Sequence, residues 1–415
     1  MKFHFFHLMP WPDLPDDFRA KHRSVWVDVD SRLYDPVRGH AVYNEYLDTL
    51  EAAAEMGFDG IGVNEHHQNA YGLMPSPQLW AAALARRTRD VSLVLMGQSI
   101  ALYNPPIRVA EEMAMIDVVS GGRLIAGFPV GTSMDSNYAF GSNPATLRER
   151  YQENHDLIIK AWTEPKVFAW NGKYNKLRYV NLWPRPIQRP HPPIWIPGGG
   201  SVETWDFCAE RGYNYSYLSF SGFKRGAMLM QGFHDRMAAL GQPFNPYQAA
   251  FAQQIIVADS WAEAERDYYP HARYFFERCL HVYPGFADAP GYRTEATLRA
   301  GLRAQVGGLG RSTAVGKTFK EAVDEGFLVA GTPDQVTEQM DDLIRKLKVG
   351  HIFCLLQLGD MPRARVEKSA RLFAEQVMPR LRHHWHGYAD HWSPRPLPNE
   401  RVAPMRPVRE ANPVG

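Results

Sequence analysis

Short apolar runs alternate along the 415-residue chain with segments whose apolar residues recur every three or four positions. The apolar runs predict eight buried strands, at 2–7, 58–64, 91–96, 123–128, 194–196, 213–218, 254–257 and 352–356. The periodic segments predict helices between them, for example at 42–56, 77–87 and 107–119. Eight strands separated by helices are typical of a (β/α)8 barrel, in which parallel strands close into a cylinder inside a ring of helices.

Four stretches interrupt this alternation. They are residues 11–38, 166–193, 283–325 and a proline-rich tail at 394–415. The second stretch contains a predicted hairpin, and the third holds the closely spaced Gly307, Gly308 and Gly310. No linker divides the chain, so we expect one barrel domain over 1–393, with the insertions acting as lids or substrate loops. The tail is expected either to be unstructured or to pack on a partner subunit.

The composition excludes several classes of partner. The chain has 46 basic and 45 acidic residues, so no basic field favours nucleic acid or an anionic membrane. No apolar run approaches the ~20 residues of a membrane helix. Three cysteines lie far apart without a CxxC pair, and the first residues lack the apolar core of a signal peptide. We therefore expect a cytoplasmic protein without a disulfide framework.

Ionisable residues follow the second predicted strand directly, as Glu65-His66-His67. In a parallel barrel the chemistry lies at the C-terminal ends of the strands, and imidazole is the side chain best suited to proton transfer near neutral pH. Adjacent residues at a strand end point to opposite sides. We therefore expect one histidine to face the barrel mouth and the other to pack under a loop.

A metal site is the obvious alternative for these histidines. The triplet lacks the HExxH spacing of a helical zinc site, so it gives little support for zinc. A later cluster comprises His383, His384, His386 and His391. It lies where the last helix is expected to end, and the helix dipole favours basic side chains there. We therefore expect no metal site.

A glycine-rich turn, Gly198-Gly199-Gly200-Ser201, follows the fifth predicted strand and precedes a helix that Gly212 is expected to end. Backbone N–H groups at such a turn converge on an anion, and the helix dipole adds to their field, so a phosphate group would fit. The turn matches neither GxxxxGKS/T nor GxGxxG. A plain strand-to-helix turn is the alternative of equal weight.

A second anion-binding element begins at Asn143, a candidate helix cap, with Pro144 suited to the first helical position. Arg148 and Tyr151 share one face of this helix, whereas Arg150 points about 200° away from Arg148. Arg148 is therefore the better candidate to bind a phosphate beside a tyrosine hydroxyl. A solvated arginine on a charged helix is the alternative.

Several motifs together resemble the bacterial luciferase-like flavin-dependent oxidoreductases. They are EMGFDG at 55–60, NEHH at 64–67, NPPIRVAEE at 104–112, IDVVSGGRL at 116–124, PIWIPGGGS at 193–201 and VAGTPDQV at 329–336. Their order and spacing agree over roughly residues 1–380. The resemblance implies a (β/α)8 barrel, often a homodimer or higher homo-oligomer, that binds FMN at its C-terminal mouth.

The resemblance also implies roles for individual residues. His66 matches the catalytic histidine, and Glu65 beside it is expected to bind cofactor. The FMN phosphate is assigned to Arg148, Tyr151, Gly199, Gly200, Ser201 and Thr204. The isoalloxazine is assigned to Gly97, Gln98 and Ser99, a segment where the family often has a non-prolyl cis peptide.

The activity implied by the resemblance is oxygenation. In the two-component monooxygenases of this family, a separate NAD(P)H-flavin reductase supplies reduced FMN, and O2 adds to it as a C4a-peroxyflavin that oxygenates a small organic substrate. Pro129 stands where bacterial luciferase has a reactive cysteine, which argues against light emission. Two alternatives stay open: a deazaflavin-dependent dehydrogenase or reductase on the same barrel, and a non-catalytic flavin-binding protein.

Overall fold

The computed structural model describes residues 1–218, 220–287, 289–303, 314–398 and 401. Eight parallel strands form its barrel: β1 Lys2–His7, β2 Gly60–Val63, β3 Ser92–Leu95, β4 Leu124–Gly127, β7 Ile194–Gly198, β8 Asn214–Tyr217, β9 Ala249–Val257 and β11 His351–Leu355. The sheet closes because β9 pairs with both β8 and β11, while β1 pairs with β11 and β2. The predicted (β/α)8 barrel is confirmed.

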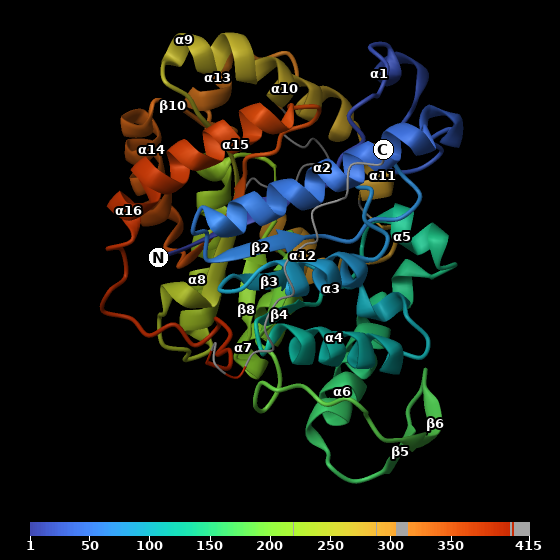
Figure 1. The fold of residues 1–415 in the computed structure, drawn as a ribbon. Coiled ribbons are helices and arrows are strands. Elements are labelled where there is room, and N and C mark those ends of the chain that lie inside the picture. The colour runs from blue at the N-terminus through green and yellow to red at the C-terminus, as the bar shows by residue number, and fades with distance from the viewer. Residues whose placement is uncertain (219, 288, 304–313, 399–400, 402–415) are drawn as a thin grey trace, which may run out of the picture.

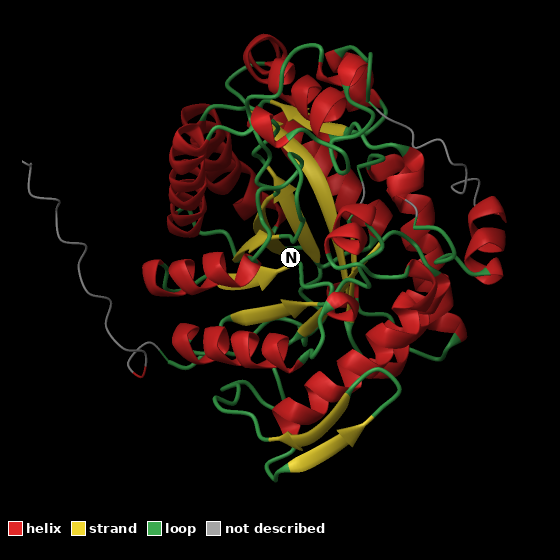
Figure 2. Cartoon of the chain, turned by 90° about the vertical axis from the view of Figure 1, so that its right-hand side faces the viewer, coloured by secondary structure: helices red, strands yellow, loops and turns green. Residues whose placement is uncertain are grey.

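Helices surround the strands on the outside (Figures 1 and 2). The longer ones are α2 Pro36–Glu55, α3 Pro77–Arg87, α4 Ile107–Ser120, α6 Leu147–Thr163, α7 Val202–Arg211, α8 Phe223–Ala239, α14 Pro333–Leu347 and α15 Arg363–Leu372. The short ones are α1 Phe18–Lys21, α5 Met134–Ala139, α9 Trp261–Glu263, α10 Tyr269–Tyr274, α11 Pro284–Ala287, α12 Glu295–Arg303, α13 Phe319–Asp324 and α16 Met378–Leu381. No helix among the described residues is both long and apolar enough to cross a membrane.

The barrel strands are buried on both faces, and this explains their sequence. Every residue of β2, β4, β8, β9 and β11 is buried. Strands covered by helices outside and packed side chains inside have no polar face, so they appear in the sequence as continuous apolar runs.

Two predicted starts were wrong by five or more residues. The seventh strand begins at Ala249 rather than 254. The prediction missed its first residues, AAFAQ, because they lack the branched side chains that mark a strand. Helix α2 begins at Pro36 rather than 42, where the Asp35 carboxylate accepts a hydrogen bond from the Arg38 N–H. The last three residues of the predicted first insertion, 36–38, therefore belong to α2.

The structure also contains strands outside the barrel. The hairpin predicted in 166–193 is present as β5 Phe168–Asn171 and β6 Lys176–Val180, at the edge of the molecule beside α6 in Figure 1. An unpredicted strand, β10 Leu328–Gly331, pairs with the far half of β9, beyond the point where β8 ends. The glycines at 307, 308 and 310 and residues 402–415 of the expected tail lie outside the described residues.

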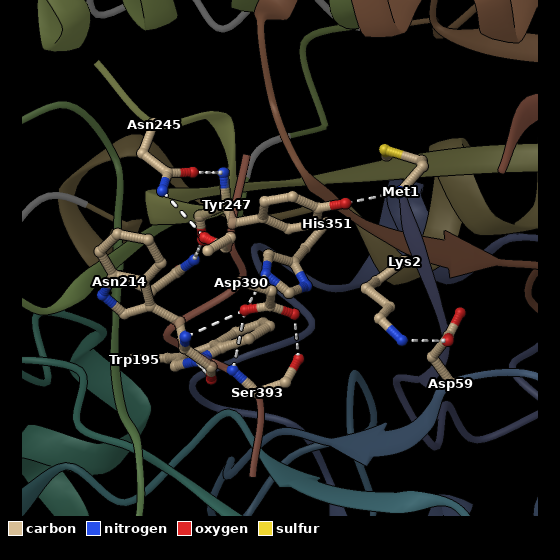
Figure 3. Close-up of polar contacts among 12 residues, drawn as sticks. Met1, Lys2, Asp59, Trp195, Asn214, Asn245, Tyr247, His351, Asp390 and Ser393 are labelled. Atoms are coloured by element: carbon tan, nitrogen blue, oxygen red, sulfur yellow. Dashed lines mark hydrogen bonds and ion pairs between the residues drawn. The ribbon is translucent and has the colours of Figure 1, made fainter. Parts of the chain in front are cut away.

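The N-terminal end of the barrel is sealed by the chain that follows α16. Figure 3 shows His351 between Tyr247, Trp195 and Asp390 at this end. Trp195 donates its indole N–H to the Trp392 carbonyl, and Asn245 donates to the Ala389 carbonyl. These contacts stabilise the barrel, because the chemistry of such barrels lies at the opposite end.

Two buried histidines meet at this sealed end. His4 Nε2 lies 3.1 Å from His351 Nδ1. Burial, and then the neighbouring His351, lower the pKa of His4 to about 3, and burial lowers the pKa of His351 to about 4. Both rings are therefore neutral at pH 7, and protonating either one would place a charge in the core.

We expect the free energy of unfolding to fall as the pH drops from 6.5 towards 5. The folded pKa values lie below the unfolded value of about 6.5, so the unfolded chain takes up protons first, at a cost of up to ~1.4 kcal/mol per pH unit for each group. His4→Gln removes one such group and should give a shallower slope. Urea denaturation at pH 7.5, 6 and 5 measures both slopes, and identical slopes would contradict the assignment.

Candidate functional site

The predicted site residues gather at the C-terminal ends of four neighbouring strands. Glu65, His66 and His67 follow β2, and Gln98 follows β3. The loop after β4 leads to α5, and the glycine turn at 199–201 joins β7 to α7. Because β2, β3, β4 and β7 are consecutive in the sheet, these loops lie on one side of the barrel mouth.

His66 is held by a carboxylate that the sequence did not single out. Its Nδ1 lies 2.9 Å from Asp135 Oδ2, which also accepts hydrogen bonds from the His67 N–H and from the Asn69 amide. The buried environment opposes ionisation of Asp135, but His66 and these hydrogen bonds hold the pKa of Asp135 below its usual value. An ionised acceptor at Nδ1 favours the tautomer that leaves Nε2 as the proton acceptor.

Aromatic rings fix the position of His66 further. The ring centroid of Tyr71 lies 4.6 Å away in an edge-on arrangement, and that of Trp26 lies 5.4 Å away. Trp26 belongs to the first insertion, so this insertion contributes directly to the site. The rings of Trp26 and Tyr71 also contact each other, with centroids 5.7 Å apart, and this aromatic cluster restricts water around the imidazole and limits its rotamers.

His67 has a different environment, as expected for adjacent residues. Its Nε2 lies 3.0 Å from Glu65 Oε1, and the other oxygen of Glu65 accepts a hydrogen bond from the Tyr103 hydroxyl. The ring of His67 packs edge-on against Phe140. Burial and the neighbouring Glu65 carboxylate raise the pKa of Tyr103, so its hydroxyl stays protonated. His67 therefore packs into a buried network, in which each oxygen of Glu65 already has one hydrogen-bond partner.

The segment after β3 brings backbone and an amide side chain close to the mouth. The Met96–Gly97 peptide is cis, at the position that the resemblance indicated. A Cβ on Gly97 would lie 2.1 Å from the Gly127 carbonyl oxygen, so only glycine fits. Gln98 is fully buried, and neither polar atom of its amide has a well-formed hydrogen bond within the described chain. Ser99 next to it is buried as well.

The turn between β7 and α7 has the shape of an anion site. Gly200 has φ +102°, which L side chains rarely adopt, and a Cβ there would meet Leu229. No atom lies within 4 Å of the Cβ position of Gly199, so the space above this residue is open. Ser201 occupies the N-cap position of α7, but its hydroxyl does not cap the helix. It points instead into the polar cluster that contains Arg148.

Arg148 reaches this turn from α6. Its Nη2 donates to the Ser201 hydroxyl at 3.0 Å and to the Tyr292 hydroxyl at 2.6 Å. Arg150 lies elsewhere, with its guanidinium 5.4 Å from the Tyr174 ring centroid. The Tyr151 hydroxyl donates to the Phe128 carbonyl at 2.9 Å, so it is not free to bind a phosphate in this conformation. Arg148 thus contacts the glycine turn and Arg150 does not, as expected because the two side chains point away from different faces of the helix.

The start of the same helix also differs from the sequence expectation in detail. Asn143 caps a 3-10 turn, Pro144–Thr146, by accepting a hydrogen bond from the Ala145 N–H. Helix α6 begins only at Leu147. Arg148 nevertheless lies in the first turn of α6, where its side chain can extend towards the turn after β7.

An acidic residue occupies the middle of this cluster. Glu203 Oε2 accepts hydrogen bonds from Ser201 and Thr297, both at 2.6 Å, and its other oxygen accepts one from Thr294. Burial opposes its ionisation, but the three hydroxyl donors outweigh this and lower the pKa of Glu203 to about 2. A pocket of only about 10 Å³, lined by Arg148, Glu203 and Thr204, remains beside it. That volume is about the size of one water molecule.

The structure thus joins most of the predicted residues into two neighbouring clusters and adds others. Arg148 and Ser201 are in contact, and Glu65 and His66 lie in one loop. Sequence reasoning missed Asp135, Tyr103, Glu203, Tyr292, Thr294 and Thr297. The one available signal was the position of Asp135 in the loop after a barrel strand, where such folds place functional groups.

Comparison with known proteins places the chain in a family. The family model for luciferase-like monooxygenases matches residues 24–350. The uncharacterized protein y4wF of Sinorhizobium fredii is 26% identical over 347 residues, covering 83% of this chain and 94% of that protein. The oxygenase component of flavin-dependent trigonelline monooxygenase from Acinetobacter baylyi is 28% identical over 198 residues, covering 46% and 52% of the two chains.

Solved structures agree on the fold. The oxygenating constituent of 3,6-diketocamphane monooxygenase from Pseudomonas putida, in complex with FMN, has a TM-score of 0.68 at 19% identity and covers 91% of this chain and 98% of its own. An F420-dependent secondary alcohol dehydrogenase has a TM-score of 0.60 at 15% identity, covering 92% and 98%. The chain belongs to the luciferase-like monooxygenase family, and it is an oxidoreductase.

Asp135→Ala should lower the free energy of unfolding by about 3 kcal/mol, because it leaves buried donors on His66, His67 and Asn69 without their acceptor. Asp135→Asn is the matched control, since it keeps the shape and one carbonyl oxygen, and it should cost less. Chemical denaturation at pH 7 measures both. A loss below about 0.5 kcal/mol for the alanine variant would show that the carboxylate does not order this loop.

Proposed function

We propose that this protein is a flavin-dependent monooxygenase that uses reduced FMN and O2 to oxygenate a small organic substrate. The observation that carries the proposal is the contact of Arg148 with Ser201 at the start of α7, beside the open Gly199. A helix N-terminus, a glycine turn and an arginine together provide the donors that a phosphate requires. The family membership adds independent support for oxygenation.

Unpartnered polar atoms support a cofactor of this kind. The Arg148 Nε, the Asn64 Oδ1 and both amide atoms of Gln98 are buried without well-formed hydrogen bonds among the described residues. Buried polar atoms are normally paired, so each of these indicates a missing partner. A flavin offers a phosphate for the arginine and, on the pyrimidine part of its ring, both donors and acceptors for the amides. The residues present therefore fit FMN.

Reduced FMN, when bound, would supply the electrons that activate O2. The protein's own residues would position the reactants and handle protons. His66 has Asp135 on Nδ1 and no hydrogen bond on Nε2 among the described contacts, so Nε2 is the atom that would hold or deliver a proton. Trp26 and Tyr71 would exclude water from this atom, which oxygenation requires because water diverts an activated oxygen to hydrogen peroxide.

Binding of a phosphate would require a rearrangement of Glu203 and of the described part of the third insertion, 283–325, which contacts it. Glu203 is ionised and accepts hydroxyls from Ser201, Thr294 and Thr297, in the same place where the phosphate would be bound. Two anions repel each other in a half-buried site, so the carboxylate would have to turn away. Thr294 and Thr297 would then lose their acceptor. This supports the expectation that the described part of 283–325 acts as a lid.

The name of one relative bears on the source of electrons. The trigonelline enzyme is described as an oxygenase component, which indicates that its reductase is a separate chain. We extend this to the present protein and propose that an NAD(P)H-flavin reductase supplies its reduced FMN. A homodimer or higher homo-oligomer stays a prediction from the family. The cytoplasmic location and the division into a barrel over 1–393 and a tail stay predictions from the sequence.

The second candidate function is a dehydrogenase or reductase that uses F420. F420-dependent enzymes occur among both the similar sequences and the similar structures. F420 also carries a phosphate, so Arg148 alone does not distinguish the two cofactors. The contact between His66 and the buried Asp135 argues against a third possibility, a non-catalytic flavin-binding protein, because a binding protein needs no ordered proton carrier.

Arg148→Ala should weaken the binding of reduced FMN by about 1.5–3 kcal/mol, because it removes a charged donor to the phosphate. Arg150→Ala is the matched control: it removes the same charge two residues away and should have a smaller effect. Anaerobic titration of each variant, with reduced FMN and with reduced F420, measures the affinities. Equal or reversed effects of the two substitutions would overturn the phosphate site, and tighter binding of F420 would favour the second candidate function.

His66→Ala should retain FMN binding, because the ring does not contact the phosphate cluster. It should lower substrate oxygenation by a factor of about 10²–10⁴, the usual scale for a positioned acid–base group, and raise the release of hydrogen peroxide. Turnover of a panel of aldehydes, ketones, terpenes and aromatic compounds, with peroxide measured in parallel, tests this. His67→Ala should mainly lower the free energy of unfolding, because it removes a hydrogen-bond partner of the buried Glu65 carboxylate. Normal coupling in the His66 variant would refute the assigned role.

A further inference from the structure

One group of metal-ligating side chains lies far from the barrel mouth. Among the described residues, Asp341, His383 and His384 place one ligand atom each within 4.8 Å of one another. Asp341 belongs to α14, and the two histidines follow α16 directly. Helices α14 and α16 pack side by side, at the left of Figure 1. No local pattern connects Asp341 with the histidines, because they lie more than forty positions further along the chain.

The orientation of His383 suits a metal ligand. Its Nδ1 lies 2.9 Å from the Arg380 carbonyl oxygen, so Nδ1 carries the proton and donates it to that oxygen. The lone pair is then on Nε2. Metal-binding histidines are typically held in this way, with the ring nitrogen that does not bind the metal donating to a carbonyl or carboxylate. The side chain is exposed, so an ion can reach it from solvent.

The other two ligands are already close together. His384 Nε2 lies 2.8 Å from Asp341 Oδ1, and the ring of His384 stacks on that of His383 with centroids 4.5 Å apart. Ligands about 2.0–2.1 Å from a tetrahedral zinc ion lie a little over 3 Å apart, so a small movement would admit the ion between them. Arg345 donates to both oxygens of Asp341, from Nε to Oδ2 at 2.8 Å and from Nη2 to Oδ1 at 3.2 Å, so it orients this carboxylate and a bound ion would share Oδ1 with it.

We propose that Asp341, His383 and His384 form a binding site for a divalent transition-metal ion such as Zn²⁺, with water completing the tetrahedron. Two imidazoles and one carboxylate are the ligands that favour Zn²⁺ over Mg²⁺ or Ca²⁺. The ion would fasten the segment after α16 to α14. That segment continues into Trp385, whose indole N–H binds the Val349 carbonyl, and into the residues that seal the N-terminal end of the barrel. The bound ion would therefore stabilise the seal without taking part in oxygenation.

The test uses the untagged full-length protein, stripped of metal with a chelator. Titration with Zn²⁺ in a calorimeter should show one ion per chain, and Co²⁺ should give the intense visible absorption of a tetrahedral site. His383→Ala should weaken Zn²⁺ binding by roughly tenfold or more. This side chain is exposed, so the variant should fold. Zn²⁺ should raise the unfolding temperature of the wild type and not that of the variant.

His386→Ala is the matched control. His386 is an exposed histidine in the same segment and is not part of the group, so its loss should leave Zn²⁺ affinity unchanged. Absence of Zn²⁺ binding by the wild type would overturn the proposal. So would undiminished binding by His383→Ala, or equal weakening by His386→Ala.

Discussion

The parallel hydrogen bonding that joins β9 to both β8 and β11 is the constraint on which the rest of the structure depends. It closes the sheet, so the barrel has no free edge, and all eight strands end at one mouth. His66, Asp135 and Ser201 come from loops that are distant in the sequence, and the parallel pairing of the consecutive strands β2, β3, β4 and β7 places them on the same side of this mouth. The opposite end, where His4 and His351 stay neutral, serves stability alone, so changes at one end can leave the other intact.

The positions of the barrel strands could be predicted from the sequence because strands buried on both faces are continuous apolar runs. The start of β9 could not, since small and polar residues at 249–253 are buried there by neighbours that the local pattern does not reveal. The same holds for β10, a four-residue strand that pairs only with the far half of β9. The local sequence indicates whether a strand is buried, but it indicates only indirectly which strands pair with it.

The residues of the candidate site also divide into those that the sequence predicts and those that it does not. His66, Arg148 and Ser201 could be predicted because each stands beside a local signal: a strand end, a helix face or a glycine turn. Asp135, Tyr292 and Asp341 could not, because their importance comes from contacts across the fold, such as the 69 positions between His66 and Asp135. The hydroxyl of Tyr151 shows the converse, since a side chain on the right helix face is directed to a backbone carbonyl instead.

Glu203 has a consequence for which molecules the protein accepts. The carboxylate lies on α7, two residues after the Ser201 hydroxyl that it occupies, so it competes with any incoming anion at a high effective concentration, on the order of millimolar or above. A free phosphate ion gains only the contacts that the carboxylate gives up, and it therefore has little advantage. A ligand that also satisfies Gln98, on the same side of the mouth, would gain hydrogen bonds that the carboxylate cannot offer. Under the proposed function, the site would therefore favour ligands that reach both Arg148 and Gln98 over simple anions, and abundant small phosphates in a cell would leave it free for the cofactor.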